Sequence, residues 1–436
     1  MFAKSRTLAV FVLTCCTTTL GLTAPASIAQ AGVRPPSPGT AVLQPGDGWA
    51  SEGAGTTGGS AADAAHVVTV HNRAELVSAL GNGDSTPKII QVRGMIDFNT
   101  AADGTRLTCD DYATGGYTRA AYLAAYDPAT WGSASPAGPQ EAARVASQKR
   151  QAARVKVRVG SNTTIVGLGK GATLRGGSLT VQNADNVIVR NIDFSNASDC
   201  FPAWAPNSGW KSEYDNLEIT SSRHVWIDHN TFSDGDEPDT SLPHYFGYIF
   251  EKHDGLLDIV RGSDLVTVSW NVFKDHDKTT LVGNSDGAAA TDSSRLRVTL
   301  HHNLYKDVGQ RAPRVRFGKV DAYNNHYVVS PTSSGAYVYS LGVGYQSQLV
   351  AEANAFTVPR SIGLGKVIKS WSGTSLTVRQ NYVNGVETDL LTLHNESFPS
   401  EHLDDGAGWA PTLRLRVDSP SAVPRIVCRH AGAGRI

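Results

Sequence analysis

The sequence has little methionine and no excess of charge of either sign. Two methionines occur in 436 residues, and 39 basic against 40 acidic residues leave a formal net charge of −1. This balance argues against a nucleic-acid protein that gains its affinity from bulk positive charge. The apolar run between Thr7 and Leu22 is too short and too rich in threonine to span a membrane.

Cysteine is scarce as well. Of the five cysteines, Cys15 and Cys16 lie in the N-terminal apolar run, which leaves Cys109, Cys200 and Cys428. Three thiols cannot all pair with one another, so at most one disulfide is expected. The sequence does not indicate which pair would form it, and isolated thiols are the simplest interpretation. Neither CxxC nor Cys/His spacing occurs, which argues against a zinc site, and no nucleophile elbow, Walker loop or Rossmann fingerprint stands in a supporting context.

The N-terminal segment has the layout of an export signal. Lys4 and Arg6 precede the apolar run, and a small-residue A-x-A site closes the segment at residue 31. These features are typical of a secretory signal peptide, so we expect residues 1–31 to be removed and the protein to be secreted and extracellular. A lipid anchor on Cys15 or Cys16 is less well supported, because no small-residue lipobox precedes either.

The remaining chain is expected to form one domain. Residues 32–65 are rich in Gly, Pro, Ser, Ala and Thr, which predicts a flexible lead-in with no fold of its own. Residues 66–436 could exceed one domain by length alone, but solenoids and barrels run long as single units. Helical periodicity is rare and is clearest from Glu141 to Ala153.

One short pattern returns along the chain: β-branched residues, then Asn, then an aromatic residue, usually two positions later. Its clear copies contain Asn191 and Phe194, Asn230 and Phe232, Asn271 and Phe273, and Asn303 and Tyr305. Its weaker copies contain Asn325 and Tyr327, Asn354 and Phe356, and Asn381 and Tyr382. Such self-similarity, at a spacing of roughly twenty to forty residues, is typical of a solenoid.

Each copy holds one strand with alternating Val, Ile or Leu, followed by a turn rather than a helix. Such strands stack in parallel when the chain coils. Stacked Asn side chains can then hydrogen-bond along the stack, Asn tolerates left-handed turns, and the aromatic residues can stack inside the coil. We therefore predict an all-β fold, a right-handed single-stranded parallel β-helix with long loops forming a substrate groove and few short helices. Adhesins, binding modules and enzymes can all be built this way, so the fold does not decide function.

Three acidic residues occur in two of the strand-like segments. Asp215, Asp254 and Asp258 would lie on successive coils, and calcium prefers such oxygen ligands. Asp254 and Asp258 share one face of a continuous strand, although Gly255 is expected to break it. Solvated surface acids are the alternative interpretation.

A cationic cluster follows these acids. Lys278, Arg311 and Arg316 would supply it, and arginine suits bidentate recognition of carboxylates. Pro313 interrupts the strand, so Arg311 is expected at a turn while Arg314 and Arg316 share a face. An acid cluster beside a cationic one fits an anionic polymer bridged by a cation, whereas a salt-bridged sheet face is the alternative, above all for Arg314.

Asp228 and His229 suggest a catalytic pair by type. A buried Asp and His satisfied by neighbouring strands explains the segment more simply, and we prefer that structural interpretation.

Several blocks resemble polysaccharide lyase family 1. The segments VWIDHNTFSDG, HDGLLDI, DHDKTTLVG and QRAPRVRFG are similar in order and separation to the signature blocks of the Bacillus-type calcium-dependent pectate lyases. The resemblance also includes YLAAYDPATWG and ARVKVRVGSNTTIVGLG upstream and GWAPTL and AGAGRI downstream. It therefore covers nearly the whole chain after residue 31.

The resemblance implies a role for each matching position. It implies a calcium cofactor bound by Asp215, Asp254 and Asp258, an acidic polysaccharide substrate, and Arg311 as the base that removes the C5 proton of a galacturonate unit. It implies that Lys278 and Arg316 bind substrate carboxylates, and that Asp228 is structural.

The chain departs from the family between Phe201 and Asp215. This stretch is shorter and less acidic than in the Bacillus-type enzymes, so an Asp that assists further calcium ions has no clear match. Asp199 is the nearest acid and is kept as a candidate, which leaves the number of calcium ions open.

The implied chemistry is a β-elimination on polygalacturonate. Cations near the uronate carboxylate would stabilise the charge that develops when the C5 proton leaves. A guanidinium normally stays protonated, so calcium, neighbouring cations and alkaline pH are needed to favour its neutral form. We expect activity to rise towards alkaline pH, and an optimum at about pH 5 would count against Arg311 as the base.

Three other functions would share the fold. A polygalacturonase needs paired carboxylates and usually carries NTD, GHG and RIK blocks, which are not found here. A pectin lyase would need no acid triad, and a glycan-binding solenoid would need no cationic cluster. We expect no nucleic-acid or membrane partner, and a monomer, because a solenoid with capped ends can stand alone.

Overall fold

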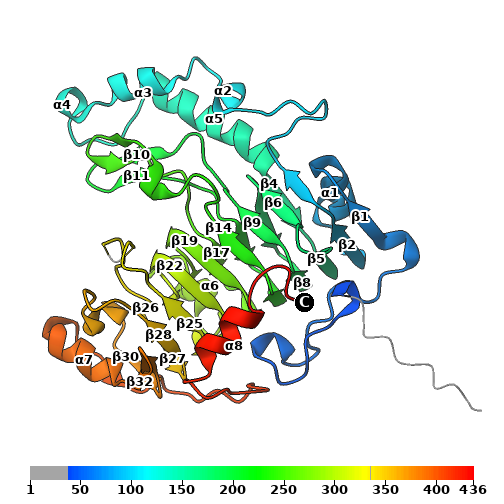
Figure 1. Cartoon of the computed structure of the whole chain (residues 1–436). Coiled ribbons are helices and arrows are strands. Elements are labelled where there is room, and N and C mark those ends of the chain that lie inside the picture. The colour runs from blue at the N-terminus through cyan, green and yellow to red at the C-terminus, as the bar shows by residue number, and fades with distance from the viewer. Residues whose placement is uncertain (1–37, 334) are drawn as a thin grey trace, which may run out of the picture. The chain divides into compact units, whose positions relative to one another are not determined.

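The chain coils into three parallel β-sheets that run beside one another (Figure 1). A computed structural model describes residues 38–333 and 335–436. The expected signal peptide over residues 1–31 lies outside the described residues. No helix in the described part of the chain is long and apolar enough to cross a membrane.

The first sheet has eleven strands, and its neighbours pair in parallel. They are β1 (Val67–Val70), β2 (Lys88–Val92), β5 (Thr163–Gly167), β8 (Asp185–Arg190), β13 (Arg223–Asp228), β18 (Asp264–Ser269), β21 (Val298–His301), β24 (Lys319–Tyr323), β27 (Gln348–Glu352), β30 (Ser375–Arg379) and β33 (Asp404–Asp405).

The second sheet has ten strands. They are β3 (Met95–Asp97), β6 (Thr173–Arg175), β9 (Asp193–Ser195), β14 (Thr231–Ser233), β19 (Val272–Lys278), β22 (Leu304–Gln310), β25 (His326–Val328), β28 (Ala355–Thr357), β31 (Tyr382–Val383) and the antiparallel edge strand β32 (Val386–Glu387).

The third sheet has eight strands. In spatial order they are β29 (Ile368–Trp371), β26 (Leu341–Gly344), β23 (Arg314–Val315), β20 (Leu281–Val282), β17 (Leu257–Val260), β12 (Leu217–Thr220), β7 (Ser178–Gln182) and β4 (Lys156–Val159). Each central coil therefore visits the eleven-, the ten- and the eight-stranded sheet in turn, and the prediction of a parallel β-helix is confirmed.

Eight α-helices lie within the described residues, together with two small hairpins. The helices are α1 (Arg73–Leu80), α2 (Cys109–Tyr112), α3 (Arg119–Ala125), α4 (Pro128–Trp131), α5 (Pro139–Val155), α6 (Ala289–Asp292), α7 (Leu390–Ser397) and α8 (Val423–His430). The hairpins are β10 (Ala203–Ala205) with β11 (Gly209–Lys211), and β15 (His244–Tyr245) with β16 (Tyr248–Ile249). The helix expected around Glu141 is α5.

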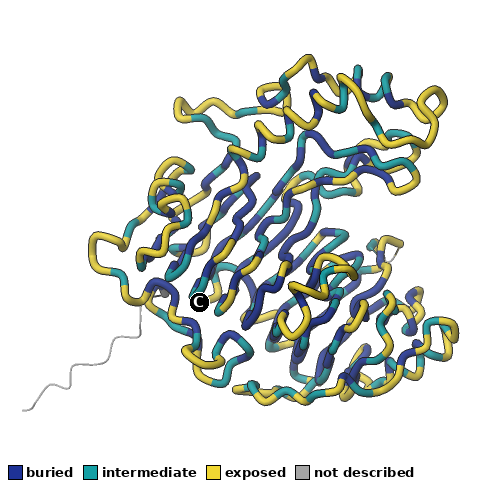
Figure 2. Tube along the Cα trace, turned by 180° about the vertical axis from the view of Figure 1, so that it is seen from behind, coloured by how far each residue is buried: buried dark blue, intermediate teal, exposed yellow. Residues whose placement is uncertain are grey.

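The core lies inside the coil, where side chains of one type stack from coil to coil. Inward Val, Ile and Leu side chains fill it, and the tube in Figure 2 is dark along the strands and light along the outer loops. The predicted aromatic stack is present, with ring centroids of neighbouring coils 4.4 to 5.1 Å apart; it contains Phe194, Phe232, Phe273, Tyr305, Tyr327 and Phe356. Stacking of these planar rings fixes the register between coils.

The predicted asparagine ladder is also present, with one correction at each end of the stack. Its fully buried members are Asn230, Asn271, Asn303, Asn325, Asn354 and Asn381. The Oδ1 atom of each later member accepts hydrogen bonds from the main-chain N–H and the side-chain amide of the asparagine on the previous coil. At the first step, Asn230 Oδ1 accepts only from the main-chain N–H of Ile192. Asn191 lies one position before the ladder, at the left-handed residue (φ 59°). The sequence register was therefore wrong there, and Tyr382, which pairs with Ala355, lies outside the aromatic stack.

The lead-in packs against the coil over residues 38–65, which corrects the prediction that this part has no fold of its own. It lies on the outside of the eleven-stranded sheet, where Ala50 is fully buried and its N–H donates to Thr267 Oγ1 at 3.0 Å. Glycine serves close approach here rather than flexibility, since a Cβ on Gly48 would lie 2.5 Å from that same Oγ1.

Within residues 38–333 and 335–436 one disulfide forms, between Cys109 at the start of α2 and Cys200 in the loop after β9. The interpretation of these two residues as isolated thiols is therefore wrong, whereas Cys428 is free and exposed. The sequence separation of 91 hides the pairing, because only the packing of α2 and α5 over the loop after β9 brings the two cysteines together.

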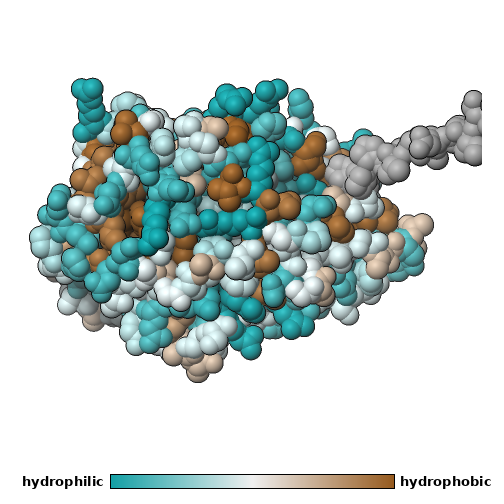
Figure 3. Space-filling view, turned by 90° about the horizontal axis from the view of Figure 1, so that it is seen from below, coloured by the Kyte–Doolittle hydropathy of each residue, from teal (hydrophilic) through white to brown (hydrophobic). Residues whose placement is uncertain are grey.

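The surface is mixed in character. On the face drawn in Figure 3, hydrophilic and neutral residues cover most of the area, and hydrophobic residues form separated patches among them. Such scattered apolar residues are ordinary for a surface in water.

Candidate active site

The candidate residues gather at one corner of the coil, where the ten-stranded sheet passes to the eight-stranded sheet. The connections at this corner are long in the early coils, for instance between β14 and β17, whereas those at the other two corners of the same coils are short. Asp215 and Asp254 lie in such loops just before β12 and β17, and Asp258 lies within β17. The fold thereby brings acids 43 residues apart onto neighbouring coils.

Gly255 lies between two of these carboxylates. A Cβ atom on Gly255 would stand 2.7 Å from Oδ1 of Asp215 and 2.7 Å from Oδ1 of Asp258. The Gly255 N–H donates to Asp215 Oδ1 at 2.7 Å, and Leu281 N–H donates to Asp258 Oδ1 at 2.9 Å. The missing side chain thus leaves a small cradle that two carboxylate oxygens face.

The acids repel one another in their partly enclosed position. Burial, with further repulsion from Asp254, raises the pKa of Asp258 to about 7. Burial followed by Asp258 and Asp254 raises the pKa of Asp215 well above its usual value. A site that disfavours its own negative charge so strongly is suited to bind a cation.

Lys278 links the acids to the cationic cluster. It ends β19, and its Nζ lies 2.8 Å from Glu251 Oε1 and 2.9 Å from Asp254 Oδ1. Burial alone would lower the pKa of Lys278, but Asp254 and Glu251 outweigh that effect and raise it. Lys278 therefore stays charged.

Arg311 follows the next strand of the ten-stranded sheet, β22, and occupies a left-handed turn (φ 60°). Its charge lowers the pKa of Asp258, against the larger effect of burial. Its Nε is buried and makes no hydrogen bond with any described residue. The guanidinium therefore lies within electrostatic reach of Asp258 and has donor capacity unused.

The two other arginines have separate surroundings. Arg314 lies in β23, where its guanidinium stacks on Trp371 at 4.3 Å, and no salt bridge holds it among the described residues. Arg316 donates through Nε to Asp286 and through a terminal nitrogen to the carbonyl of Gly283 at 2.8 Å. Of the two, Arg316 is oriented by polar contacts and Arg314 by stacking.

Asp199 and Asp228 have their oxygens fully engaged. Asp199 is buried and accepts from Phe201 N–H at 2.8 Å and from Gln148 at 2.7 Å, and burial raises its pKa to about 6. Buried Asp228 accepts from Arg190 at 2.7 Å and also binds His229 and Ser269. Burial would raise the pKa of Asp228, but His229 and Arg190 lower it overall. These contacts agree with a structural role for Asp228.

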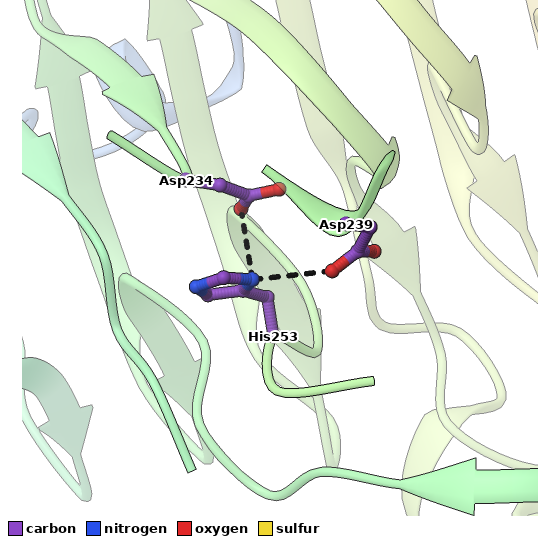
Figure 4. A group of neighbouring side chains, drawn as sticks. All are labelled: Asp234, Asp239 and His253. Carbon is purple, nitrogen blue, oxygen red and sulfur yellow. Dashed lines mark hydrogen bonds and ion pairs between the residues drawn. The ribbon is translucent and has the colours of Figure 1, made fainter. Parts of the chain in front are cut away.

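A second acid–histidine group is linked to Lys278 through His276. Asp234, Asp239 and His253 form the group, among the described residues, whose three ligand atoms lie within 4.8 Å of one another (Figure 4). His253 Nδ1 lies 3.2 Å from Asp239 Oδ1 and 3.8 Å from Asp234 Oδ1. These are ion-pair distances, so the group is explained without a metal ion.

His276 connects this group to the active-site loops, and sequence reasoning assigned it no role. Its Nδ1 donates to Asp234 Oδ1 at 2.7 Å, and its Nε2 donates to the carbonyls of Asp254 at 2.8 Å and Lys278 at 2.9 Å. Burial would lower the pKa of His276, yet Asp234 raises it to about 9. Glu251 and Gly255 were missed as well, since nothing in their local sequence indicates that they face Lys278 and the acids.

Comparison with known proteins gives consistent matches. A family model described as pectate lyase matches residues 27–115 and 134–397. A pectate lyase of Bacillus subtilis (strain 168) is 42% identical over 424 residues, covering 96% of this chain and 97% of that protein. Pectate lyase E of Dickeya chrysanthemi is 37% identical over 350 residues, covering 79% and 76%.

Solved structures agree with these matches. A thermostable pectate lyase superposes with a TM-score of 0.89 at 46% identity, over 92% of this chain and 100% of the other. A pectate lyase bound to a hexasaccharide superposes with a TM-score of 0.88 at 42% identity, again over 92% and 100%.

Proposed function

The chain belongs to the pectate lyase family, and we propose that it cleaves α-1,4-polygalacturonate by calcium-dependent β-elimination to give 4,5-unsaturated oligogalacturonates. It is a polysaccharide lyase that acts on polygalacturonate. The observation that best supports the elimination chemistry is the shared corner of the coil, where three carboxylates meet Lys278 and Arg311.

Asp215, Asp254 and Asp258 would hold the calcium ion. Oxygen ligands are what calcium prefers, and the cradle that a Gly255 Cβ would fill brings two carboxylate oxygens towards one point. Asp254 would be released from Lys278 to join them. The charge of the three acids, which the protein alone compensates incompletely, fits a divalent cation.

Arg311 would act as the base. When bound, calcium would stabilise the negative charge that develops on the uronate carboxylate. Arg311 in its neutral form accepts the C5 proton, the C5–H electron pair becomes the C4=C5 double bond, and the C4–O bond breaks. The departing oxygen leaves with that bonding pair and takes a proton from water. Lys278 and Arg316 orient the uronate carboxylates beside Arg311.

Export of the protein belongs to the same proposal. The Cys109–Cys200 disulfide supports an oxidising, extracellular setting, in which a pectic substrate would be met.

The acid cluster favours calcium-dependent cleavage of polygalacturonate over the activity of a pectin lyase, which needs no cation site. We propose a monomer, since the edge of the ten-stranded sheet is closed by the antiparallel turn of β31 and β32.

The direct test is the ultraviolet absorbance of the 4,5-unsaturated product during incubation with polygalacturonate. With calcium at alkaline pH the absorbance is expected to rise, and excess chelator is expected to abolish the rise. New reducing ends without that absorbance would show hydrolysis instead and contradict the proposal. The absence of both the absorbance and new reducing ends would contradict catalysis on this polymer altogether.

Replacing Gly255 by alanine is expected to weaken calcium activation. The added Cβ would lie 2.7 Å from both carboxylate oxygens, so it would force them apart. We expect the calcium concentration for half-maximal activity to rise about 10- to 100-fold, with a smaller change in rate at saturating calcium. Gly363→Ala is the control, because nothing lies within 4 Å of its Cβ position. Equal calcium dependence in both variants would contradict the assigned cradle.

A further inference from the structure

Glu251 shares the ammonium group of Lys278 with one member of the acid cluster. It lies in the loop between β16 and β17, and its Oε1 is 2.8 Å from Lys278 Nζ, while Asp254 Oδ1 is 2.9 Å from the same nitrogen. The side chains of Lys278 and Glu251 are 12% and 18% exposed, against 36% for Asp254. Lys278 therefore has two counter-ions, and Glu251 is the more deeply buried of them.

The two carboxylates have different electrostatic surroundings. Burial and then neighbouring acids, Asp254 among them, raise the pKa of both Asp215 and Asp258, so Asp254 belongs to the group that would bind calcium. Burial also raises the pKa of Glu251, and Lys278 is the charge that opposes this effect most. In the described part of the chain, the Glu251 carboxylate forms an ion pair only with Lys278. Glu251 is therefore matched to the lysine rather than to the acid cluster.

The main chain around these side chains is held in place. His276 donates to the carbonyls of Asp254 at 2.8 Å and of Lys278 at 2.9 Å. In the loop before β17, the carbonyl of Lys252 accepts from the N–H of Asp199 at 2.7 Å. Rotation of the Asp254 side chain is then sufficient to part it from Lys278, without any movement of the strands.

A second counter-ion matters because Lys278 is largely buried. A buried charge that loses its only partner is strongly destabilising, since it is neither solvated nor paired. Glu251 avoids this penalty, because Lys278 keeps one ion pair when Asp254 turns to calcium. An ammonium group has three N–H donors, so the donor that Asp254 gives up becomes free for a uronate carboxylate.

We propose that Glu251 is a positioning residue that holds Lys278 in place while Asp254 exchanges the lysine ammonium for calcium. This role deepens the proposed function and rests on it. Calcium binding and substrate binding are then coupled, because the same exchange frees an N–H of Lys278 for the substrate. Glu251 itself contacts neither the calcium ion nor the reacting atoms.

The test is Glu251→Gln, with the Kd for calcium measured by calorimetric titration of the substrate-free protein. Glutamine cannot neutralise Lys278, so the ammonium holds Asp254 more firmly against calcium. We expect the Kd for calcium to rise about 5- to 20-fold. We expect kcat at saturating calcium to fall about three- to tenfold, because Lys278 is no longer fixed beside the substrate.

A second background separates this exchange from a general effect of charge. In Lys278→Met protein no ammonium competes for Asp254, so adding Glu251→Gln is expected to change the Kd for calcium by less than about twofold. Glu251→Asp keeps the negative charge and is expected to restore the Kd to within about threefold of the wild type. The matched control is Glu237→Gln, which removes a carboxylate 2.6 Å from Lys252 in the same loop and is expected to leave the Kd unchanged.

Three results would overturn the role of Glu251. An unchanged Kd in Glu251→Gln would do so, and so would an equal loss with and without Lys278, because Glu251 would then act on calcium directly. A loss that Glu251→Asp does not recover would show an effect of packing rather than of charge.

Failure of the proposed function is recognised from the wild type alone. A wild type that binds calcium but gives no ultraviolet product would contradict the elimination, and the calcium titrations would still decide the role of Glu251. A wild type that binds no calcium would contradict the calcium site and the exchange at Asp254 together.

Discussion

Arg311→Lys is expected to lower kcat by about 10²- to 10⁴-fold while calcium binding is retained. Lysine keeps the positive charge but places its nitrogen differently from the guanidinium whose Nε is now buried and unpartnered beside Asp258. The measurement is the initial rate of unsaturated product at saturating calcium, with calcium affinity determined separately by titration.

Arg314→Lys provides the matched control. Arg314 lies three residues after Arg311 in the chain, and its guanidinium stacks on Trp371 instead of facing the acids. We expect a change of less than about tenfold for this variant. Comparable losses in both variants would assign the effect to the charge of the cluster rather than to a base at Arg311.

Asp258→Asn is expected to remove most of the calcium activation, with an increase of at least about 100-fold in the calcium concentration required. The amide keeps the shape of the side chain but loses the charge that faces the cradle. The measurement is calcium titration of the elimination rate. Asp275→Asn is the control. The Asp275 carboxylate is exposed, and it forms an ion pair with Lys274 at 3.8 Å.

The same substitution should change how the calcium-free protein responds to pH. A carboxyl group whose folded pKa is raised, to about 7 for Asp258, binds more protons when folded than when unfolded. The stability that it contributes is therefore present at acid pH and is lost as the pH rises through about 7. Thermal melts in chelator should show the wild type losing stability between about pH 5 and pH 8, and Asp258→Asn losing less.

Calcium should reverse that loss more strongly at about pH 8 than at about pH 5, because the ion replaces protons on the acids. A calcium effect that is equal at both pH values, or larger at the lower one, would contradict the assignment of the acids as its ligands. Asp275→Asn should behave like the wild type in this comparison.

The repeating part of the fold could be predicted from the sequence because it is periodic. Residues such as Asn271 and Phe273 recur in phase with each coil, and stacking identical side chains satisfies the buried amides and packs the rings. The failure at Asn191 has the same origin. Asparagine suits both the left-handed turn position and the ladder position that follows it. The sequence pattern alone therefore does not tell which of the two Asn191 occupies, and an error of one residue exchanges them.

For the loops, the residues themselves indicated only which side-chain types are present, and the role of each came from the family resemblance. The sequence by itself determined the coil, its stacked interior and the presence of acids and arginines, since alternation and repetition are local properties of the chain. Only the tertiary structure decided that Gly255 stands between Asp215 and Asp258, that His276 holds the carbonyls of Asp254 and Lys278, and that Cys109 meets Cys200. These contacts depend on how loops of unequal length fold over one corner of the coil, and no short-range periodicity records that.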